Sequence, residues 1–295
     1  LAFAPVIYGV VLVGLILVLV LPSQGHGARR WLDLGPFQVQ LSEFCKVAVV
    51  LLLARYFDTV KAKIRKPRFF LGAMAMVAVP VMLILVEPDL GTAFVFLPVM
   101  LVMLYLAGSK TKHLVSVCLL GLASSPLLWH FLKDYQKRRL VAFIKPEVDP
   151  LGWGYQTIQS KIATGSGRFL GKGWLHGTQS RLNFLPAQHT DFVFSVYSEE
   201  WGFIGAAILL GLFFLIIARG VEIMLRARDF SGNILAGGLV ALLACHILIN
   251  IAVVLGLMPV TGLPLPFMSY GGSSLVSMMA VIGLLLNVRA RSRVF

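Results

Sequence analysis

Charged residues and cysteines are scarce in this chain. Only 13% of its 295 residues are charged and 58% are hydrophobic, with a mean hydropathy of +0.86, whereas a typical soluble domain is about 25% charged. This scarcity excludes a disordered chain, a collagen and an ordinary cytosolic enzyme. The three cysteines, Cys45, Cys118 and Cys245, form no CxxC pair, which argues against a disulfide framework or a cysteine zinc site.

The hydrophobic residues lie in long blocks, so lipid is the expected solvent for most of the chain. A membrane-spanning helix needs roughly 20 apolar residues. The blocks predict an all-α polytopic membrane protein with a single membrane domain over residues 1–295 and eight spans, at residues 1–21, 40–57, 69–86, 91–107, 113–132, 192–218, 233–255 and 272–288. The chain begins inside an apolar run without an initiator Met, which indicates a longer protein upstream.

The connections between these spans alternate in charge. Residues 58–68, 108–112, 219–230 and 289–295 carry a net charge of +10, whereas residues 22–39, 87–90 and 256–271 carry −1. Cytoplasmic loops of membrane proteins carry the excess of Lys and Arg. The first set is therefore predicted to lie in the cytoplasm and the second set outside.

One long connection departs from this pattern. By alternation, residues 133–190 form a large extracytoplasmic loop, yet they carry nine Lys and Arg against three acids. The surplus fits either contact with anionic lipid headgroups or a site for an anionic substrate, because Lys and Arg bind phosphate. We favour the substrate site, since the loop is rich in glycine and aromatic residues and leads into an acidic segment. A nucleic-acid binder is the weakest interpretation, because the largest basic region faces outward.

Two short polar motifs lie at the ends of spans. Residues 87–92 (EPDLGT) are typical of a tight hairpin between helices, in which Asp89 caps the second helix. In the motif that opens the second span, Ser42 is the expected N-cap, and Glu43 and Lys46 are three residues apart, close enough to pair. The pair is either a structural ion pair or part of a site, because ionisable groups at membrane depth face a protein interior or a wet cavity.

The end of the large loop carries further polar candidates. Asp191, at the entrance to the sixth span, is either a general base with a pKa raised by partial desolvation or a helix N-cap. His189 is a candidate metal or phosphate ligand, although no other His lies at zinc-ligand spacing. The glycines of residues 165–173 either allow backbone N–H groups to converge on an anion or form a flexible turn. Residues 256–272, with three prolines and no charge, predict a re-entrant outer segment that lines the same cavity.

Together these motifs resemble those of the shape, elongation, division and sporulation (SEDS) family, which comprises RodA, FtsW and SpoVE, and its elongation group in particular. The resemblance covers almost the whole chain, through the motifs at residues 27–31 (GARRW), 42–46 (SEFCK), 159–163 (QSKIA), 173–180 (GWLHGTQS), 186–192 (PAQHTDF) and 269–274 (SYGGSS). The chain departs from the family at Leu41, where Pro is usual, and at Arg168, where Gly is usual. Family members have ten spans, which implies two before residue 1.

The resemblance implies a peptidoglycan glycosyltransferase that polymerises lipid II for cell elongation and rod shape. It places the protein in the bacterial cytoplasmic (inner) membrane, with the active site on the outer, periplasmic face. It implies that Asp191 is the catalytic aspartate and that Ser42, Glu43 and Lys46 form the family's Ser-Glu-x-x-Lys site. A class B penicillin-binding protein, a transpeptidase, is the implied partner.

The expected reaction is an inverting displacement that forms a β-1,4 bond. Asp191 would deprotonate the acceptor hydroxyl, and cations would neutralise the polyprenyl diphosphate leaving group. The expected substrate-binding residues are Glu43, Lys46, Arg29, Arg138, Arg139, Lys161, Lys172, Gln179, His189 and Ser273. A divalent cation, Mg²⁺ or Mn²⁺, is the expected cofactor, because phosphate groups recruit such ions.

Two other functions remain open from the sequence. A lipid II flippase would explain the broken backbone and the charges at membrane depth, although the ionisable groups cluster toward the outer side. A non-catalytic scaffold for the transpeptidase would explain the partner, but it does not require nine cations beside an acidic site.

Overall fold

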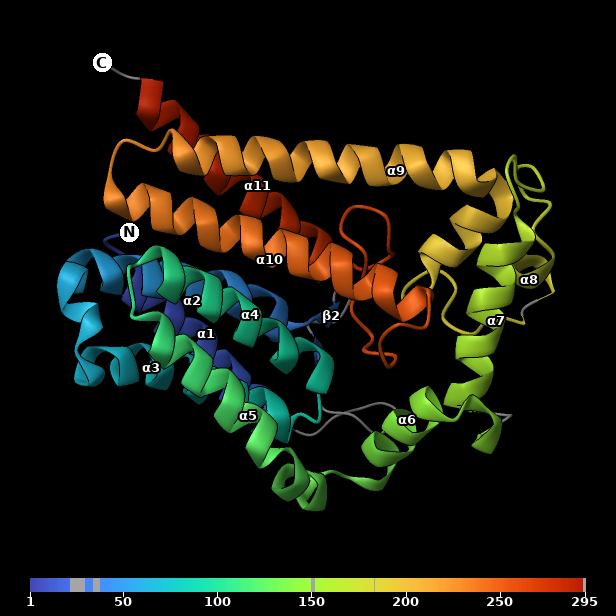
Figure 1. The fold of residues 1–295 in the computed structure, drawn as a ribbon, viewed down its shortest axis with the longest axis horizontal. Helices are drawn as coiled ribbons and strands as arrows, with labels where there is room; N and C mark the ends of the chain where they lie inside the picture. Colours follow the sequence, from blue (N-terminus) through green and yellow to red (C-terminus); the bar gives the residue numbers. More distant parts are fainter. Residues whose placement is uncertain (22–29, 34–37, 150–151, 183, 294–295) are drawn as a thin grey trace. The chain divides into compact units, whose positions relative to one another are not determined.

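The computed structural model describes residues 1–21, 30–33, 38–149, 152–182 and 184–293. Within these residues the chain is mostly helical and forms, in order, α1 (Ala4–Val20), β1 (Leu32–Asp33), β2 (Gln38–Val39), α2 (Leu41–Val60), the 3₁₀-helix η1 (Lys61–Arg65), α3 (Pro67–Val86), α4 (Leu90–Leu106), α5 (Thr111–Phe131), α6 (Asp134–Ile144), the 3₁₀-helix η2 (Pro146–Val148), α7 (Trp153–Ser166), α8 (Thr178–Arg181), α9 (Val193–Leu225), α10 (Phe230–Val254) and α11 (Gly272–Arg293) (Figure 1).

Each range predicted to span the membrane contains a helix. Among the described residues, four helices are long and apolar enough to cross a membrane, namely α3, α9, α10 and α11. The helices α1 and α4 are apolar but shorter. The described residues are thus mostly helical with long apolar helices, as predicted, apart from the two-residue strands β1 and β2. The exact number of spans and the large extracytoplasmic loop stay predictions.

The chain divides into two compact units, and each is described by itself. The first comprises Leu1–Ser116, Ile217–Cys245 and Gly271–Phe295, and the second comprises Val117–Ile216 and His246–Tyr270. The long helices α5, α9 and α10 each contribute to both units.

In the first unit, α2 is the central helix and packs against α1, α3, α4 and α11. The helix begins at Leu41 with Gln40 as its N-cap, so the prediction that Ser42 caps it is wrong. Gln40 is extended because it directly follows the β1–β2 pair, and the chain turns into the helix before it reaches Ser42. The Gln40 N–H donates to the hydroxyl of Ser273 at 3.0 Å, which ties the start of α2 to the start of α11.

The hairpin between α3 and α4 has the predicted cap. The Asp89 carboxylate accepts hydrogen bonds from the backbone N–H of Thr92 at 3.2 Å and from its hydroxyl at 2.9 Å. These bonds satisfy donors of the first helical turn, which have no partner within the helix. Asp89 is therefore the N-cap of α4.

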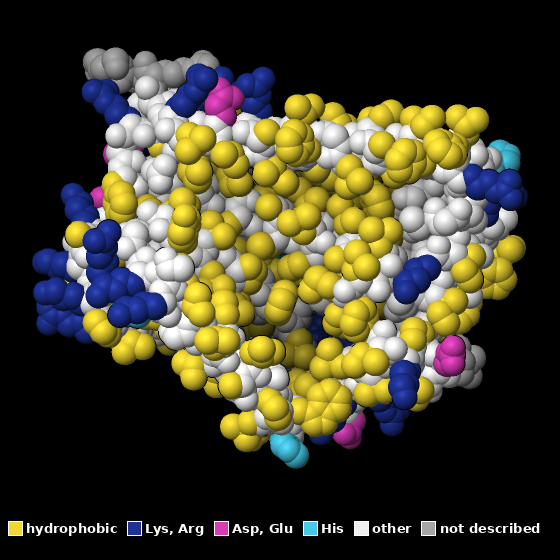
Figure 2. Space-filling view, viewed as in Figure 1, with side chains coloured by type: hydrophobic (Ala, Val, Ile, Leu, Met, Phe, Trp, Pro, Cys, Tyr) yellow, Lys and Arg dark blue, Asp and Glu magenta, His cyan; other side chains and the backbone are white. Residues whose placement is uncertain are grey.

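In the second unit, the predicted loop of residues 133–190 contains α6, η2, α7 and α8. The helices α6 and α7 pack against each other and against η2, and α8 contacts α7. Between α10 and α11 the chain forms no helix, as its prolines predict. Figure 2 shows hydrophobic side chains along α9, where Ile208, Leu212 and Phe214 are exposed, as expected for a helix that contacts lipid.

Candidate active site

Three successive carbonyl oxygens in the turn before α9, those of residues 189–191, accept hydrogen bonds from other parts of the second unit. The backbone N–H of Tyr270 donates to the first at 2.8 Å, and the Ser269 hydroxyl donates to the second at 2.5 Å. The side-chain amide of Asn250 donates to the third, which is the carbonyl of Asp191, at 3.1 Å. These bonds hold the backbone that carries the Asp191 carboxylate in one orientation.

Asn250 joins this turn to the segment between α10 and α11. It lies in α10 with 1% of its surface exposed, and its amide nitrogen also donates to the carbonyl of Leu263 at 2.8 Å. The next residue toward the N-terminus, Gly262, has a φ of +74°, and a Cβ there would lie 3.7 Å from Asp191 Oδ2. The backbone of the predicted re-entrant segment therefore borders the Asp191 carboxylate, which is itself partly exposed.

A buried carboxylate, Glu199 of α9, anchors the loop between α7 and α8. Lys172 Nζ lies 2.6 Å from Glu199 Oε1 and 2.7 Å from the Thr178 hydroxyl. The backbone N–H groups of Thr178 and Gln179 donate to the same carboxylate at 2.8 and 3.2 Å. Two predicted substrate ligands, Lys172 and Gln179, thus take part in fixing the loop to α9. Glu199 and its neighbour Glu200 are both buried.

The helix α9 is broken at Gly202, where φ is 62° and ψ is −162°. The break frees the carbonyls of Glu199 and Glu200, and these accept hydrogen bonds from the N–H groups of Lys172 and Gly173, both at 3.0 Å. Of the two interpretations of residues 165–173, an anion-binding loop or a flexible turn, the first does not hold for these two N–H groups. They are used by the broken helix instead.

The same loop also supplies the acceptors that the broken helix needs. The N–H groups of Phe203 and Ile204 donate to the carbonyls of Arg168 and Phe169 at 2.8 and 3.2 Å. Irregular backbone is tolerated at membrane depth only where other protein groups or water satisfy it. The glycine-rich loop thus completes the hydrogen bonding of α9.

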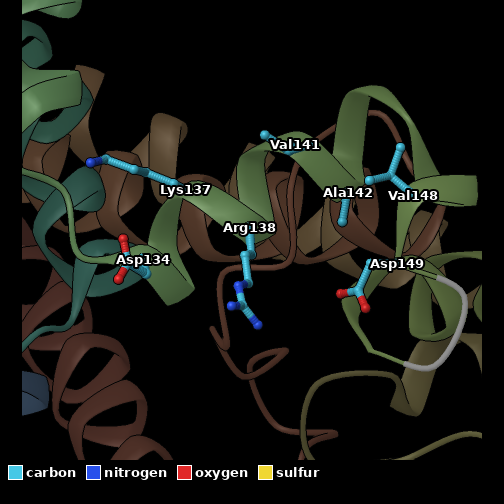
Figure 3. Close-up of a pocket in the computed structure, with 7 residues that line it drawn as sticks. All are labelled: Asp134, Lys137, Arg138, Val141, Ala142, Val148 and Asp149. Atoms are coloured by element: carbon cyan, nitrogen blue, oxygen red, sulfur yellow. The ribbon is translucent and has the colours of Figure 1, made fainter.

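A pocket of about 410 Å³ lies beside α6 and contains one of the predicted phosphate ligands. It is lined by Asp134, Lys137, Arg138, Val141, Ala142, Val148 and Asp149. Figure 3 shows Arg138 extending from α6 between the carboxylates of Asp134 and Asp149. The second predicted ligand on this helix, Arg139, lies over the ring of Trp153 at 4.1 Å and so braces α6 against α7.

Lys161 lies against the segment that follows α10. A Cβ on Gly256 would come within 1.9 Å of Lys161 Cε, so the lysine side chain crosses the backbone of this glycine. The preceding residue, Ser160, holds α7 in place, because its hydroxyl is 2.8 Å from both the Ser195 hydroxyl and the Val254 carbonyl. The structure therefore places Lys161 beside the segment that also borders Asp191.

The predicted ligand His189 lies exposed in the turn before α9, with its ring Nε2 3.4 Å from the side-chain amide of Gln188. The other predicted ligands belong to the first unit or lie outside the described residues. Lys46 Nζ is 2.6 Å from Glu43 Oε1, which confirms the predicted pair, and the Ser277 hydroxyl donates to Glu43 Oε2 at 3.3 Å. Ser273 accepts from Gln40, as described above. Arg29 lies outside the described residues.

Sequence reasoning missed a second buried carboxyl group, that of Glu87 in the hairpin between α3 and α4. Glu87 is 1% exposed, and among the described residues neither of its carboxylate oxygens has a hydrogen-bond partner. Burial and, to a lesser extent, the nearby Asp89 carboxylate raise the pKa of Glu87 to about 8, although Arg30 acts in the opposite direction. Arg30 donates to the carbonyls of Glu87 and Pro88, at 3.2 and 2.5 Å, rather than to the carboxylate.

Sequence reasoning also missed Asn250, for which a signal exists. A lone amide within the apolar run of residues 247–254 has to find hydrogen-bond partners inside the protein.

No group of three His, Cys, Asp or Glu that could hold a metal ion occurs among the described residues.

Comparison with known proteins identifies the chain's relatives. The family model of the cell cycle proteins FtsW, RodA and SpoVE matches residues 1–294. The peptidoglycan glycosyltransferase MrdB of Escherichia coli (strain K12) is 42% identical over 294 residues, which cover 99% of this chain and 79% of that protein.

Solved structures give the same result. A structure described as the coordination of polymerization and crosslinking by a peptidoglycan synthase complex matches with a TM-score of 0.84 and 34% identity, over 100% of this chain and 82% of that one. The rod shape determining protein RodA of Thermus thermophilus matches with a TM-score of 0.71 and 34% identity, over 100% of this chain and 79% of that one. The chain therefore belongs to the FtsW, RodA and SpoVE family of cell cycle proteins.

Proposed function

We propose that this chain is a peptidoglycan glycosyltransferase that polymerises lipid II for cell elongation. Relatives that bear this enzyme name are 36–42% identical to it over at least 90% of its length. The observation that carries the mechanism is that the backbone at Asp191 is fixed. The Asp191 carbonyl and the two carbonyls before it each accept a hydrogen bond from a residue between positions 250 and 270. Such fixation suits a catalytic group, because proton transfer requires a positioned base.

Asp191 is the general base in this mechanism. The donor sugar is α-linked to a polyprenyl diphosphate and the product bond is β-1,4, so a single inverting displacement suffices. Asp191 Oδ takes the proton of the acceptor hydroxyl as that oxygen attacks the anomeric carbon and the bond to the diphosphate breaks. The Gly262 backbone borders the carboxylate without a side chain, which leaves room for the acceptor sugar.

Cations of the second unit neutralise the diphosphate as it leaves. Arg138 is the best candidate, because it lines the pocket beside α6, and Lys161 is the second, because it lies against the segment next to Asp191. Electrostatic stabilisation of developing charge is usually the largest catalytic contribution. Arg139 serves mainly to hold α6, which carries Arg138, and Lys172 serves mainly to hold the loop between α7 and α8.

A divalent cation would act through the substrate's phosphate oxygens. Mg²⁺ is commonly held by one or two carboxylates together with phosphates, and Asp134 and Asp149 line the same pocket as Arg138. Asp149 also accepts a hydrogen bond from the Trp153 N–H at 2.9 Å, which leaves its other oxygen for an ion. No step of the mechanism above depends on the metal.

The chain is a multi-pass membrane protein of bacterial cell wall synthesis, and its finer topology is part of the proposal. Eight helices span the inner membrane, with residues 133–190 and the active site on the periplasmic face, because the basic short loops are cytoplasmic. A class B penicillin-binding protein is the partner that crosslinks the product, since one similar structure is described as a complex that coordinates polymerization with crosslinking.

Polymerisation of lipid II by the purified full-length chain with its transpeptidase partner tests this function. We expect glycan strands from the wild type and none from Asp191→Asn, which keeps the size of the side chain but removes the base. Asp58→Asn, at the far end of α2 in the first unit, is the matched control and should polymerise like the wild type. Full activity of a folded Asp191→Asn protein would contradict the assignment of the base.

A further inference from the structure

A second pocket, unrelated to Asp191, lies at the end of the first unit where α4 ends and α5 begins. It has a volume of about 420 Å³ and is lined by Arg65, Gly108, Ser109, Lys110, Thr111 and Lys112. All three of its ionisable groups are cationic and exposed. Figure 2 shows Lys and Arg side chains gathered over this end of the unit.

The pocket contains the N-terminus of a long helix in an unfavourable electrostatic setting. The helix α5 begins at Thr111 and has no acidic residue in its first turn. The side chain of Lys110, which precedes it, has only donors and cannot cap the first N–H groups. Of these groups, the His113 N–H donates to the Lys110 backbone carbonyl at 2.9 Å. The positive end of the helix dipole is thus flanked by Lys110 and Lys112, an arrangement that a bound anion would stabilise.

A second helix N-terminus adds to this positive potential. The helix α3 begins at Pro67 after Lys66 and also lacks an acid in its first turn. The rings of Phe70 in α3 and His113 in α5 lie 5.2 Å apart, so the first turns of the two helices are neighbours. Arg65 Nε donates to the Gly108 carbonyl at 3.3 Å, which holds its guanidinium at the pocket.

Ser109 supplies independent evidence for a ligand. Ser109 lines the pocket and is 8% exposed, and among the described residues its hydroxyl has no hydrogen-bond partner. A buried hydroxyl without a partner costs free energy. A phosphate oxygen in the pocket would supply the missing acceptor.

Apolar side chains near the pocket favour a lipid over a soluble anion. Leu71 of α3 and Val115 of α5 are 59% and 49% exposed, and Tyr105 at the end of α4 is 65% exposed. They lie within about one turn of the helix ends that form the pocket. Tyrosine at such a level is typical of the membrane–water boundary, and the exposed aliphatic side chains provide a surface for acyl chains.

We propose that this pocket binds the phosphate group of an anionic membrane lipid through Arg65, Lys110, Lys112, Ser109 and the N-terminus of α5. Basic pockets between transmembrane helices recognise lipid headgroups by the same chemistry. The site is distinct from the glycosyl transfer site and does not depend on the assignment of Asp191.

Equilibrium binding of dioleoylphosphatidylglycerol to the purified full-length chain in mixed micelles tests the proposal, with dioleoylphosphatidylcholine as the neutral reference. We expect Lys110→Gln/Lys112→Gln to weaken binding of the anionic lipid about 25-fold, because each lysine that lines the pocket would contact the lipid phosphate and contribute roughly fivefold. The matched control is Lys61→Gln/Lys63→Gln, which removes two exposed lysines of η1 that do not line the pocket. The control should weaken binding less than twofold.

Two further arms keep the test decisive. Ser109→Ala retains every charge and should weaken binding several-fold, which covers the case in which the double lysine variant fails to fold. Inorganic phosphate at millimolar concentration should not displace the lipid. Equal losses in the two lysine pairs, or wild-type binding by Ser109→Ala, would overturn the pocket, and displacement by inorganic phosphate would overturn the choice of a lipid.

Discussion

Lys46 Nζ lies 2.6 Å from Glu43 Oε1 within α2, and 1% and 2% of the two side chains are exposed. The other carboxylate oxygen of Glu43 accepts from Ser277 of α11. A buried ion pair of this kind can have either of two roles. It either stabilises the packing of α2 against α11 or holds charges ready for a substrate.

A double variant separates these roles. Lys46→Met and Glu43→Gln should each lower the free energy of unfolding by about 3–5 kcal/mol, because each leaves one buried charge without its partner. The double variant Glu43→Gln/Lys46→Met should regain most of this stability, since it buries no charge. We expect it to remain inactive in lipid II polymerisation. Wild-type activity in the thermally stable double variant would show that the pair is only structural.

The break in α9 leaves no room for a side chain. A Cβ on Gly202 would lie 2.3 Å from Gly171 N and 2.7 Å from Phe169 O. The positive φ at this position would cost a residue with a side chain further free energy. Gly202→Ala should therefore destabilise the protein by at least about 1–3 kcal/mol and detach the glycine-rich loop. Gly211→Ala is the control in the same helix, where nothing lies within 4 Å, and it should be neutral or slightly stabilising. Melting temperatures of the two variants in the same detergent provide the measurement.

The raised pKa of Glu87 makes stability depend on pH. The folded state holds a proton on Glu87 up to about pH 8, whereas an unfolded chain releases it near the ordinary glutamate pKa of about 4.3. The folded state thus binds more protons between these values, and stability should fall as the pH rises from about 4.5 to about 8. Below that window the contribution of the neutral form is present in full.

Glu87→Gln should remove this dependence. The amide stays neutral at every pH, so the melting temperature of the variant should exceed that of the wild type at pH 8.5 and approach it at pH 5. Glu147→Gln, at an exposed carboxyl group of η2, should show the wild-type profile. A wild-type slope in Glu87→Gln would mean that another group titrates.

Much of the fold could be predicted because hydrophobicity and length decide where helices form in a lipid solvent. The cap at Asp89 and the Glu43–Lys46 pair depend on neighbours three residues apart, and the sequence indicates both. The cap of α2 was misplaced because the β1–β2 pair, which makes Gln40 extended, has only two residues in each strand and leaves no periodic signal.

The candidate site could be predicted only in part, because its geometry depends on contacts between distant segments. The glycines of residues 165–173 suggested an anion site, but their role follows from a break at Gly202, which is 29 or more residues away in the chain. Lys172 looked like a phosphate ligand because the sequence does not reveal that it meets Glu199. Asn250 was missed because only the folded chain brings it to the Asp191 carbonyl.

Asn250 provides the sharpest test of how the base is positioned. Asn250→Leu removes the hydrogen-bond donor to the carbonyls of Asp191 and Leu263, which should cost about 1–3 kcal/mol in stability. Because the carboxylate then loses its fixed orientation, kcat for lipid II polymerisation should fall at least tenfold while KM changes less than threefold. A loss of binding would instead raise KM.

A second asparagine in the same helix separates positioning from general destabilisation. Asn233 Nδ2 donates to the Met224 carbonyl at 2.8 Å, so Asn233→Leu removes a bond of the same kind in the first unit. It should lower the melting temperature by a smaller amount, because it removes one such bond and not two, and it should keep the wild-type kcat. If both variants lose kcat equally, the effect of Asn250 is one of stability and its role in orienting Asp191 is refuted. If only Asn250→Leu loses kcat, the hydrogen bond to the Asp191 carbonyl is what holds the base in place.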